Sequence, residues 1–380
     1  MTYLDNAATS FPKPESVYQA MDRCAREQLA NPGRAGHRMA VACERIIDDC
    51  RHRLNRLLNG RGPERFILTL NATDGLNMAI KGLLHPGDHA ITSNIEHNSI
   101  NRPLRALELA GVITVTRLTH DGSGLIDPDV LKRALQPNTR LVAITHGSNV
   151  LGSIQPIAEF GRIVRERDSL LLIDASQTVG AVPIDLQADA VDLMAFPGHK
   201  ALLGPTGTGS LYVGPRAQLA PWREGGTGGD STSETQPTEL PYRLEGGTPN
   251  VLGICGLAAG IAYVEEHGIE NIRRHELTLA NRLRSRLLEL GLEVFGPADP
   301  KQRVGLVSFR TPKLPPPELA AILDQSFDIA VRSGLHCAPF AHKSVGSFPD
   351  GLVRASPGPF STDDDIDRLT DALKEILAGV

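Results

Sequence analysis

Short apolar runs alternate with segments of helical periodicity through the first two thirds of the chain. The runs that predict strands span residues 65–70, 89–92, 112–115, 141–145, 170–174 and 191–196. Segments that predict helices begin at Thr73, near Asn98, after Pro128 and after Pro156. Because the strands are nearly all apolar, both faces of their sheet are expected to be covered. The alternation predicts an α/β fold with a mainly parallel central sheet and helices on both faces.

The pattern differs at both ends of this alternation. Prolines at positions 12 and 14 predict an extended arm, and helices are predicted over 15–29 and about 39–58. Residues 224–248 are rich in Gly, Ser and Thr, which is typical of a long functional loop or a cover for a partner subunit. Further helices are predicted over 252–266, 270–290, 316–325 and 363–377, with strands over 305–309 and 329–332.

These changes predict three parts. An N-terminal arm over 1–14 packs with a small domain, a large domain spans 15–255, and a small C-terminal α/β domain spans 256–380.

Composition excludes several classes of protein. The 380 residues are 41% hydrophobic and 22% charged, with a formal net charge of −5, which argues against nucleic-acid and membrane-surface binding. No apolar run is long enough to span a bilayer, and the N-terminus lacks signal-peptide features. The five cysteines form no CxxC pair and are expected to be reduced thiols, four of them packing residues. We expect a cytoplasmic protein.

Two polar residues at strand ends indicate a cofactor. Asp174 ends an apolar run, where a carboxylate is costly to bury without a cationic partner. Lys200 follows the next strand in the stretch Phe196-Pro197-Gly198-His199-Lys200. A pyridinium nitrogen needs an anion and an aldehyde needs an amine, so the pair indicates pyridoxal phosphate. A helix N-cap for Asp174 and a surface position for Lys200 are the alternatives.

Other residues at strand ends could complete such a site. Thr73 and Asp74 lie where a strand runs into a helix, and free N–H groups there favour a phosphate, although a plain helix cap is the alternative. His97 could stack on an aromatic cofactor, and Asn149 or Gln177 could donate to its ring oxygen, unless they are structural or turn residues. The glycine-rich residues 204–210 lack the lysine of a nucleotide-binding P-loop.

Cys337 differs in setting from the other cysteines. It lies in a loop bounded by Gly and Pro, close to Arg332 and His336, and cationic neighbours favour a thiolate. His336, Cys337 and His342 lack a second pair of ligands, so no metal is expected. Arg354 follows a strand-like run and could bind a substrate carboxylate, with a surface ion pair as the alternative.

Together these stretches resemble the pyridoxal-phosphate cysteine desulfurases of the class V aminotransferase superfamily. Within it, the short cysteine loop is similar to the group II, selenocysteine-lyase-like branch. The resemblance covers nearly the whole chain, from Tyr3-Leu4-Asp5-Asn6-Ala7-Ala8-Thr9 to Val353-Arg354-Ala355-Ser356. Its motifs are Gly198-His199-Lys200, Asp174-Ala175-Ser176-Gln177, Ser148-Asn149-Val150-Leu151-Gly152 and Arg332-Ser333-Gly334-Leu335-His336-Cys337-Ala338.

The resemblance implies a fold-type I homodimer, pyridoxal 5'-phosphate in the large domain and the catalytic cysteine loop in the small one. Lys200 would hold the cofactor aldehyde and transfer protons, Asp174 would pair with the pyridinium and His97 would stack on the ring. The remaining cofactor contacts would come from Gln177, Asn149, Thr73, His199, the backbone near Asp74 and, toward the neighbouring subunit, Thr227. Substrate contacts would come from Arg354, Asn149 and Arg34.

The implied reaction converts L-cysteine to L-alanine. Cys337 would attack the substrate sulfur and keep it as a persulfide for a sulfur acceptor, which could be a protein. The alternatives are a selenocysteine lyase acting on L-selenocysteine, another β-lyase, an aminotransferase or an epimerase. A sulfur-relay or scaffold subunit and a nucleotide-binding module are the non-catalytic alternatives.

Pro197 departs from the family pattern, which has Ser or Thr at this position. A proline lacks both the hydroxyl and the backbone N–H that would bind phosphate, so the sequence predicts weak cofactor retention. Pro197→Ser is expected to slow cofactor loss during dialysis, followed by visible absorbance. An unchanged rate of loss would contradict this prediction.

Overall fold

Seven strands form the central sheet of the larger part of the molecule. The computed structural model describes residues 1–33, 36–228 and 232–379. The sheet order is β2 (Phe66–Thr69), β8 (Gly209–Val213), β7 (Leu193–Pro197), β6 (Leu170–Asp174), β5 (Thr139–Thr145), β3 (His89–Ser93) and β4 (Thr114–Leu118). From β7 to β4 every neighbouring pair is parallel, which confirms the mainly parallel sheet.

Strand β8 runs antiparallel to both of its neighbours and was not predicted from the sequence. It follows β7 through the glycine-rich turn at 198–208 instead of a helix. A parallel neighbour needs a crossover connection that is usually helical, so this short connection returns the chain in the opposite direction.

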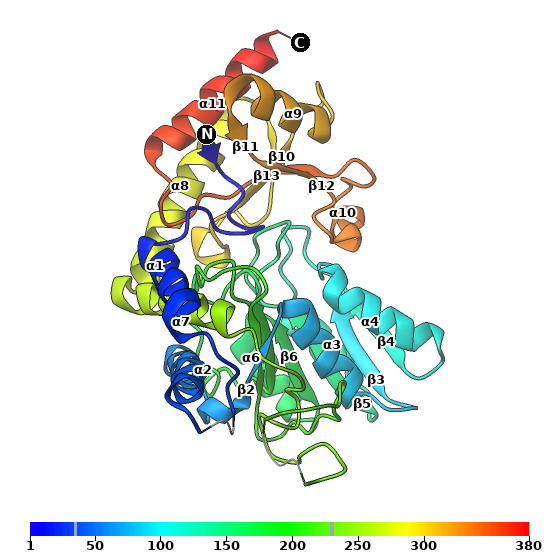
Figure 1. The fold of residues 1–380 in the computed structure, drawn as a ribbon. Helices are drawn as coiled ribbons and strands as arrows, with labels where there is room; N and C mark the ends of the chain where they lie inside the picture. The colour runs from blue at the N-terminus through cyan, green and yellow to red at the C-terminus, as the bar shows by residue number, and fades with distance from the viewer. Residues whose placement is uncertain (34–35, 229–231, 380) are drawn as a thin grey trace.

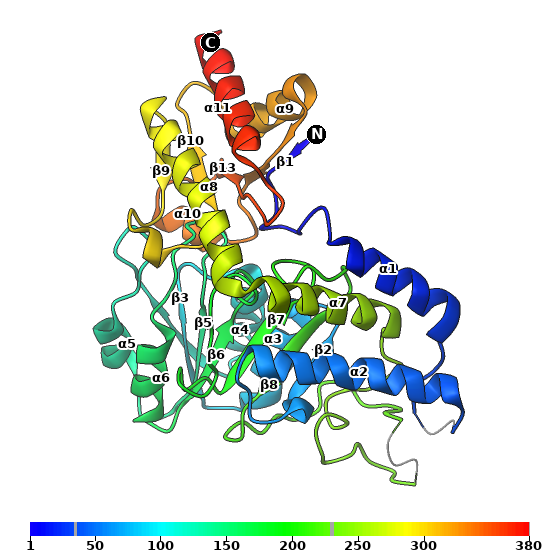
Figure 2. The ribbon, with the colours of Figure 1, turned by 90° about the vertical axis from the view of Figure 1, so that its left-hand side faces the viewer.

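Alternate side chains of the strands enter two different cores. In β5, Val142 and Ile144 face the first core, and Leu141 and Ala143 face the second. The first core is covered by α2 (Arg38–Leu57), α5 (Pro128–Ala134), α6 (Ile157–Arg165) and α7 (Val251–His267), and the second by α3 (Ala72–Leu83) and α4 (Asn98–Leu109). Helices thus lie on both sides of the sheet (Figures 1 and 2), which explains why its strands are apolar throughout.

Three helices form an outer layer beside β2. Helix α1 (Glu15–Arg23) continues as the π-helical η1 (Cys24–Gln28), and both pack with α2 against α7. Figure 2 shows α1, α2 and α7 side by side. Cys24, Cys43 and Cys50 are buried in this layer, as packing thiols would be.

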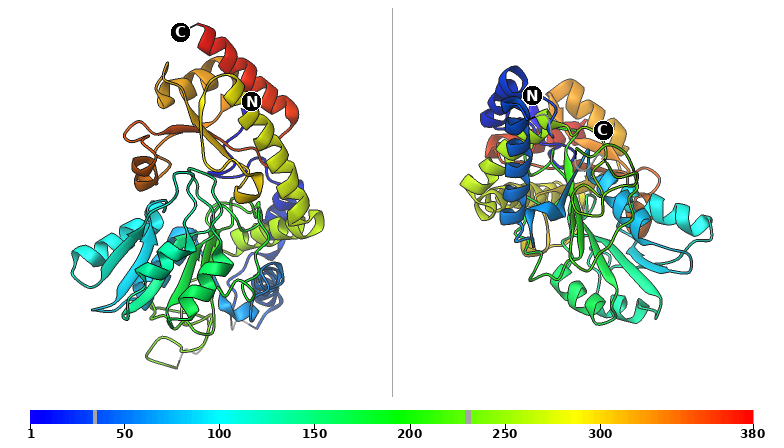
Figure 3. Two further views of the ribbon diagram at one scale, coloured as in Figure 1. Left: turned by 180° about the vertical axis from the view of Figure 1, so that it is seen from behind. Right: turned by 60° about the horizontal axis from the view of Figure 1, so that its bottom comes forward.

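The smaller part contains an antiparallel sheet packed under three helices. Its strand order is β12 (Arg332–Gly334), β13 (Leu352–Ala355), β10 (Val307–Arg310) and β9 (Glu293–Phe295). The helices are α8 (Ile269–Glu289), α9 (Pro316–Phe327) and α11 (Asp363–Ala378), and the short elements η2 (Pro63–Arg65), η3 (Pro300–Gln302) and α10 (Pro339–Ser344) complete the chain. Helix α8 follows α7 after Gly268 and runs between the two parts (Figure 3).

The N-terminal arm lies against the smaller part. Strand β1 (Thr2–Tyr3) pairs in parallel with β11 (Ile329–Ala330), and Leu4 is fully buried in the core formed by α8, α9 and α11. Both ends of the chain therefore lie in the upper part of Figure 1. In the described ranges, no helix combines the length and apolarity that crossing a membrane would require.

Helix α11 begins with a reciprocal cap. The hydroxyl of Thr362 accepts from the Asp365 N–H at 3.3 Å, and the Asp365 carboxylate accepts from the Thr362 N–H at 2.8 Å. Thr362→Ala removes this hydroxyl acceptor and should cost about 1 kcal/mol of stability. We expect a lower midpoint in urea unfolding followed by circular dichroism. Thr238→Ala, in an exposed loop, is the matched control, and an equal effect in both variants would contradict this account.

Candidate active site

The ends of β6 and β7 place Asp174 and Lys200 at the same edge of the sheet. Asp174 closes β6, pairs with Ala195 of β7 and is 3% exposed. Its Oδ1 accepts from the N–H of Ser176 at 2.9 Å and from the hydroxyl of Ser176 at 2.5 Å. Burial lowers the pKa of Lys200 to about 8, although the charge of Asp174 opposes this shift. A substantial fraction of this amine is therefore neutral, and nucleophilic, near pH 8.

His97 caps α4 from the next part of this edge. Its Nδ1 accepts from the Ser99 N–H at 3.1 Å and lies 2.8 Å from the Ser99 hydroxyl. That hydroxyl is also 2.8 Å from Oγ1 of Thr73, so a single serine joins the start of α3 to the start of α4. Burial lowers the pKa of His97, although the charge of Asp174 opposes this shift. The ring is therefore neutral near pH 7 and offers a flat face for stacking.

Of the proposed phosphate contacts, the Asp74 N–H is already hydrogen-bonded, whereas Nδ1 of His199 has no partner in the described residues. Asn71 caps α3 and accepts from the Asp74 N–H at 2.9 Å, so that donor already has a partner. His199 has a buried Nδ1 without a partner in the described ranges, and burial lowers its pKa to about 4. An uncharged ring with an unsatisfied nitrogen is a candidate hydrogen-bond donor to an anion.

Pro197 ends β7 directly opposite Gly209 of β8. The glycines of this turn are explained by close packing. A Cβ at Gly209 would lie 2.8 Å from the backbone carbon of Asn71, and one at Gly204 would lie 3.0 Å from Cα of Leu257. Close backbone packing therefore explains the glycines at 204 and 209.

The Cys337 loop has an unusual backbone conformation. His336 and Cys337 have φ angles of 48° and 58°, in the left-handed region that side chains with a Cβ seldom adopt. Three hydrogen bonds hold it there. The carbonyl of Cys337 accepts from the N–H of Asn98 at 2.8 Å, that of His336 accepts from Nδ2 of Asn149 at 2.7 Å, and that of Leu335 accepts from the Ala338 N–H at 2.8 Å.

These bonds place the Cys337 loop beside the start of α4, one residue from His97. The side chain of Cys337 is exposed, while the four other cysteines are buried or partly buried. The loop therefore presents a thiol at the edge of the site instead of packing it.

Arg332 places a cation beside this thiol, with its Nη2 4.0 Å from Sγ of Cys337. The expectation that His336 also supplies positive charge is wrong. Its ring is 3% exposed, and burial lowers its pKa to about 2, so it is neutral in the folded protein.

Arg354 is buried in the sheet of the smaller part, with 1% of its side chain exposed. Its Nη1 donates to the carbonyl of Asn149 and its Nη2 to Oδ1 of Asp5, each at 2.9 Å. Its Nε is buried without a partner in the described residues. A surface ion pair is thereby excluded, because the guanidinium is desolvated and lies between the two parts of the molecule.

The remaining candidates lie in different places. Nε2 of Gln177 donates to the carbonyl of Ala7 at 3.0 Å, which brings the arm to the end of β6. Arg34 is outside the described residues.

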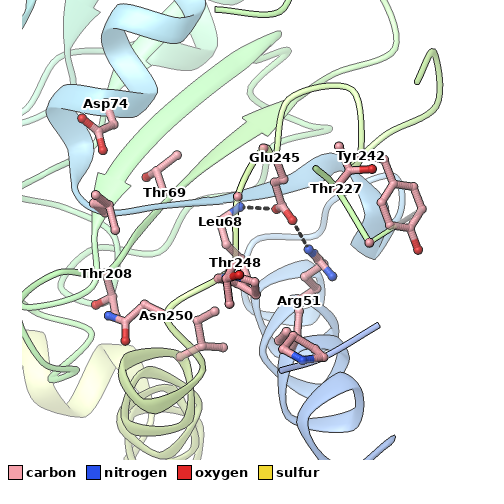
Figure 4. A pocket seen from close by; sticks show the side chains of 18 of the residues that line it. Arg51, Leu68, Thr69, Asp74, Thr208, Thr227, Tyr242, Glu245, Thr248 and Asn250 are labelled. Carbon is pink, nitrogen blue, oxygen red and sulfur yellow. Dashed lines mark hydrogen bonds and ion pairs between the residues drawn. The ribbon is translucent and has the colours of Figure 1, made fainter. Parts of the chain in front are cut away.

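Thr227 lines a separate cavity of about 640 Å³, which also contacts Asp74. Figure 4 shows one wall of this cavity, where Glu245 pairs with Arg51 at 2.5 Å and accepts from the Leu68 N–H at 2.7 Å.

Several residues of the site were not anticipated from the sequence. Asp5 reaches Arg354, and Nζ of Lys13 donates to the carbonyl of His199 at 2.8 Å. Glu96 is fully buried, where it accepts from Oγ of Ser93 at 2.5 Å and from the Thr145 N–H at 2.8 Å. Glu96 directly precedes His97, and Asp5 lies in the N-terminal motif. The residues around them in the sequence do not indicate which group either carboxylate contacts.

Comparisons with known proteins agree over almost the whole chain. A family model described as Aminotransferase class-V matches residues 2–369. A "Probable cysteine desulfurase" of Methanothermobacter thermautotrophicus is 36% identical over 381 residues, covering 98% of this chain and 94% of that protein. The apo structure of a cysteine desulfurase from Thermococcus onnurineus NA1 superposes with a TM-score of 0.94 at 33% identity, covering 100% of this chain and 95% of that one.

A second solved structure gives the same result. The cysteine desulfurase CsdA of Escherichia coli, in an S-sulfonic acid form, has a TM-score of 0.90 at 28% identity, covering 100% of this chain and 95% of that one.

The lowered pKa of Lys200 predicts how its amine responds to pH. In protein without cofactor, labelling of Lys200 by dinitrofluorobenzene should rise with pH and reach half its maximum near pH 8, because only the neutral amine reacts. Peptide mass spectrometry measures the label, and Lys200→Arg should abolish it. Labelling that keeps rising about tenfold per pH unit up to pH 10, as for an ordinary lysine amine, would contradict the shift.

Proposed function

The chain belongs to the aminotransferase class-V family, and from this we propose that it is a pyridoxal-phosphate-dependent cysteine desulfurase of the group II branch. The carrying observation is the Cys337 loop. Its strained backbone is tied by Asn98 and Asn149 to the edge of the sheet that bears His97, and its thiol is exposed. Cysteine desulfurases are the relatives and solved structures to which the chain is similar.

The residues at this edge fit pyridoxal 5'-phosphate. Lys200 provides an amine whose pKa is about 8, Asp174 provides a buried carboxylate for a pyridinium nitrogen, and His97 provides a neutral ring for stacking. Nδ1 of His199, which has no partner within residues 1–33, 36–228 and 232–379, and the hydroxyl of Thr73 would bind the phosphate. When bound, the cofactor supplies an electron sink for bonds at the substrate's α-carbon.

The protein's own side chains then position the substrate and move protons. Arg354 would bind the substrate carboxylate, because its buried Nε lacks a partner in the described residues. Lys200 can take up and release a proton near neutral pH, since its pKa is close to that range. The carboxylate of Asp174 would pair with the protonated ring nitrogen of the cofactor. Gln177 and Asn149 would contact the ring oxygen.

Cys337 would receive the sulfur. Its thiolate forms an S–S bond with the substrate sulfur while the substrate C–S bond breaks, and a proton delivered to the carbon completes L-alanine. Nη2 of Arg332, 4.0 Å from Sγ, would place a cation beside this sulfur. Because the side chain is exposed, a sulfur-acceptor protein could reach the resulting persulfide.

We further propose a cytoplasmic homodimer. Apolar side chains are exposed beside the cavity of Figure 4: Leu70 is 50% exposed, Trp222 39% and Tyr242 45%. Such a patch favours a protein interface. In the dimer, Thr227 would contribute to the phosphate site of the neighbouring subunit.

Cys337→Ala tests this proposal most directly. The variant should bind cofactor with unchanged visible absorbance but release no sulfide and alanine from L-cysteine, because no thiol remains to accept the sulfur. Cys255→Ala, which removes a partly buried thiol of α7, is the matched control and should remain active.

The opposite outcome distinguishes the alternatives. Full turnover of another amino acid by Cys337→Ala would favour a different β-lyase, an aminotransferase or an epimerase on the same scaffold. Faster turnover of L-selenocysteine than of L-cysteine by the unmodified protein would favour a selenocysteine lyase.

A further inference from the structure

We propose that Asp5 is a positioning residue for substrate binding: the carboxylate of the N-terminal arm orients the guanidinium of Arg354 so that its remaining N–H groups meet the substrate carboxylate. This inference rests on the proposed function, in which Arg354 binds that carboxylate. It gives the N-terminal arm, through Asp5, a role in substrate binding.

The contact between Asp5 and Arg354 is made deep in the molecule. Nη2 of Arg354 lies 2.9 Å from Oδ1 of Asp5, and the exposed fractions of the two side chains are 1% and 21%. A buried guanidinium loses its hydration and must regain hydrogen bonds and opposite charge from the protein. Asp5 supplies the carboxylate, and Asn149 supplies a carbonyl oxygen at 2.9 Å from Nη1.

The two contacts leave donors unused. A guanidinium has five N–H groups, and carboxylates bind pairs of them in parallel. In the described residues the Nε of Arg354 is buried and has no partner. An unsatisfied buried donor is costly, so this nitrogen would gain from a ligand carboxylate.

The backbone holds Asp5 in place on both sides. The N–H of Leu4 donates to the carbonyl of Ala330 at 2.9 Å, and the N–H of Ser356 donates to the carbonyl of Leu4 at 2.7 Å. After Asp5, the N–H of Asn6 donates to the carbonyl of Ser356 at 3.2 Å. Since Ser356 lies two residues beyond Arg354, the arm and the guanidinium share one rigid strand edge.

This anchoring favours positioning over competition. A carboxylate that competes with the substrate must turn away when the substrate arrives, whereas the backbone pairing of Leu4 and Asn6 keeps Asp5 beside Arg354. Asp5 therefore remains a neighbour of Arg354 in both states, and its effect is on the orientation and charge of the guanidinium.

The same arm also reaches the lysine. The hydroxyl of Ser10 donates to the carbonyl of Lys200 at 3.0 Å, and the N–H of Ser10 donates to the carbonyl of His199 at 3.1 Å. Residues 5–10 thus connect the carboxylate-binding group in the smaller part to the amine in the larger part.

The test compares Asp5→Ala, Asp5→Asn and Asp328→Asn in cofactor-loaded protein. Three quantities are measured for each variant: KM and kcat for alanine release from L-cysteine, and the Kd of L-alanine from the change in cofactor absorbance. Asp328 pairs with the Met1 amine on the same arm, has a side chain 66% exposed and does not contact Arg354, so its amide variant is the matched control.

Asp5→Ala should raise both KM and Kd about tenfold, the scale of a lost charge-assisted hydrogen bond, with kcat within about twofold. Asp5→Asn keeps an acceptor oxygen and should stay within about threefold. Asp328→Asn should match the unmodified protein. If Asp5→Ala fails to retain cofactor, Asp5→Glu replaces it, because one added methylene displaces the carboxylate and should raise KM and Kd in the same way.

Two results would overturn the inference. Unchanged KM and Kd in Asp5→Ala would mean that Asp5 only stabilises the fold, and lower values would mean that it competes with the substrate. Failure of the proposed function looks different: the unmodified protein would release no alanine from L-cysteine. In that case a raised Kd for L-alanine in Asp5→Ala would still support the role of Asp5.

Discussion

A single desolvated cation connects most of the elements on which this site depends. Arg354 lies in the middle of the molecule, and burial makes its charge costly unless neighbouring groups compensate. Asp5 of the arm and the carbonyl of Asn149 provide that compensation. Asn149 in turn donates to His336 in the Cys337 loop. The requirement to satisfy one guanidinium therefore links the smaller part, the arm and the cysteine loop.

Burial also decides which groups of the site carry charge. His97, His199 and His336 each have a lowered pKa, and desolvation is the largest cause for all three. Near neutral pH they act as neutral rings, available for stacking or for hydrogen bonding. Positive charge comes instead from arginines and from Lys200, whose amine can also lose its proton. Such a site attracts carboxylates and phosphates while it keeps a neutral nucleophilic amine available.

Local sequence patterns predicted the central fold well because their causes are local. The apolar runs marked the strands from β2 to β7, and helical spacing marked α2, α7, α8 and α11 within a few residues. Strand β8 was missed because its Gly-Ser start resembles a turn, and its burial comes from neighbours far away in sequence. The resemblance to desulfurases grouped Lys200, Asp174, Cys337 and Arg354 into one proposed site, but it named no protein group that would bind Arg354.

The unpredicted features all depend on contacts between distant segments. Nothing near Asp5 in the sequence indicates that a residue 349 positions away would bind it. The neutral state of His336 could not be read from its spacing to Cys337, because burial by the rest of the fold determines it. The residue types indicated which functional groups could react, whereas the charge state of each group depended on its surroundings in the folded protein.

The pairing of β1 with β11 has a consequence for the order of assembly during synthesis. Thr2–Tyr3 leave the ribosome long before their partner strand, Ile329–Ala330, is made. Domains generally fold as units while the chain is elongated, so the larger part can form while the arm still lacks its partner. Arg354 and Cys337 also arrive late. The growing chain thus contains Lys200 before Cys337 and Arg354, and the arm can complete its pairing only after Ser356 has been made.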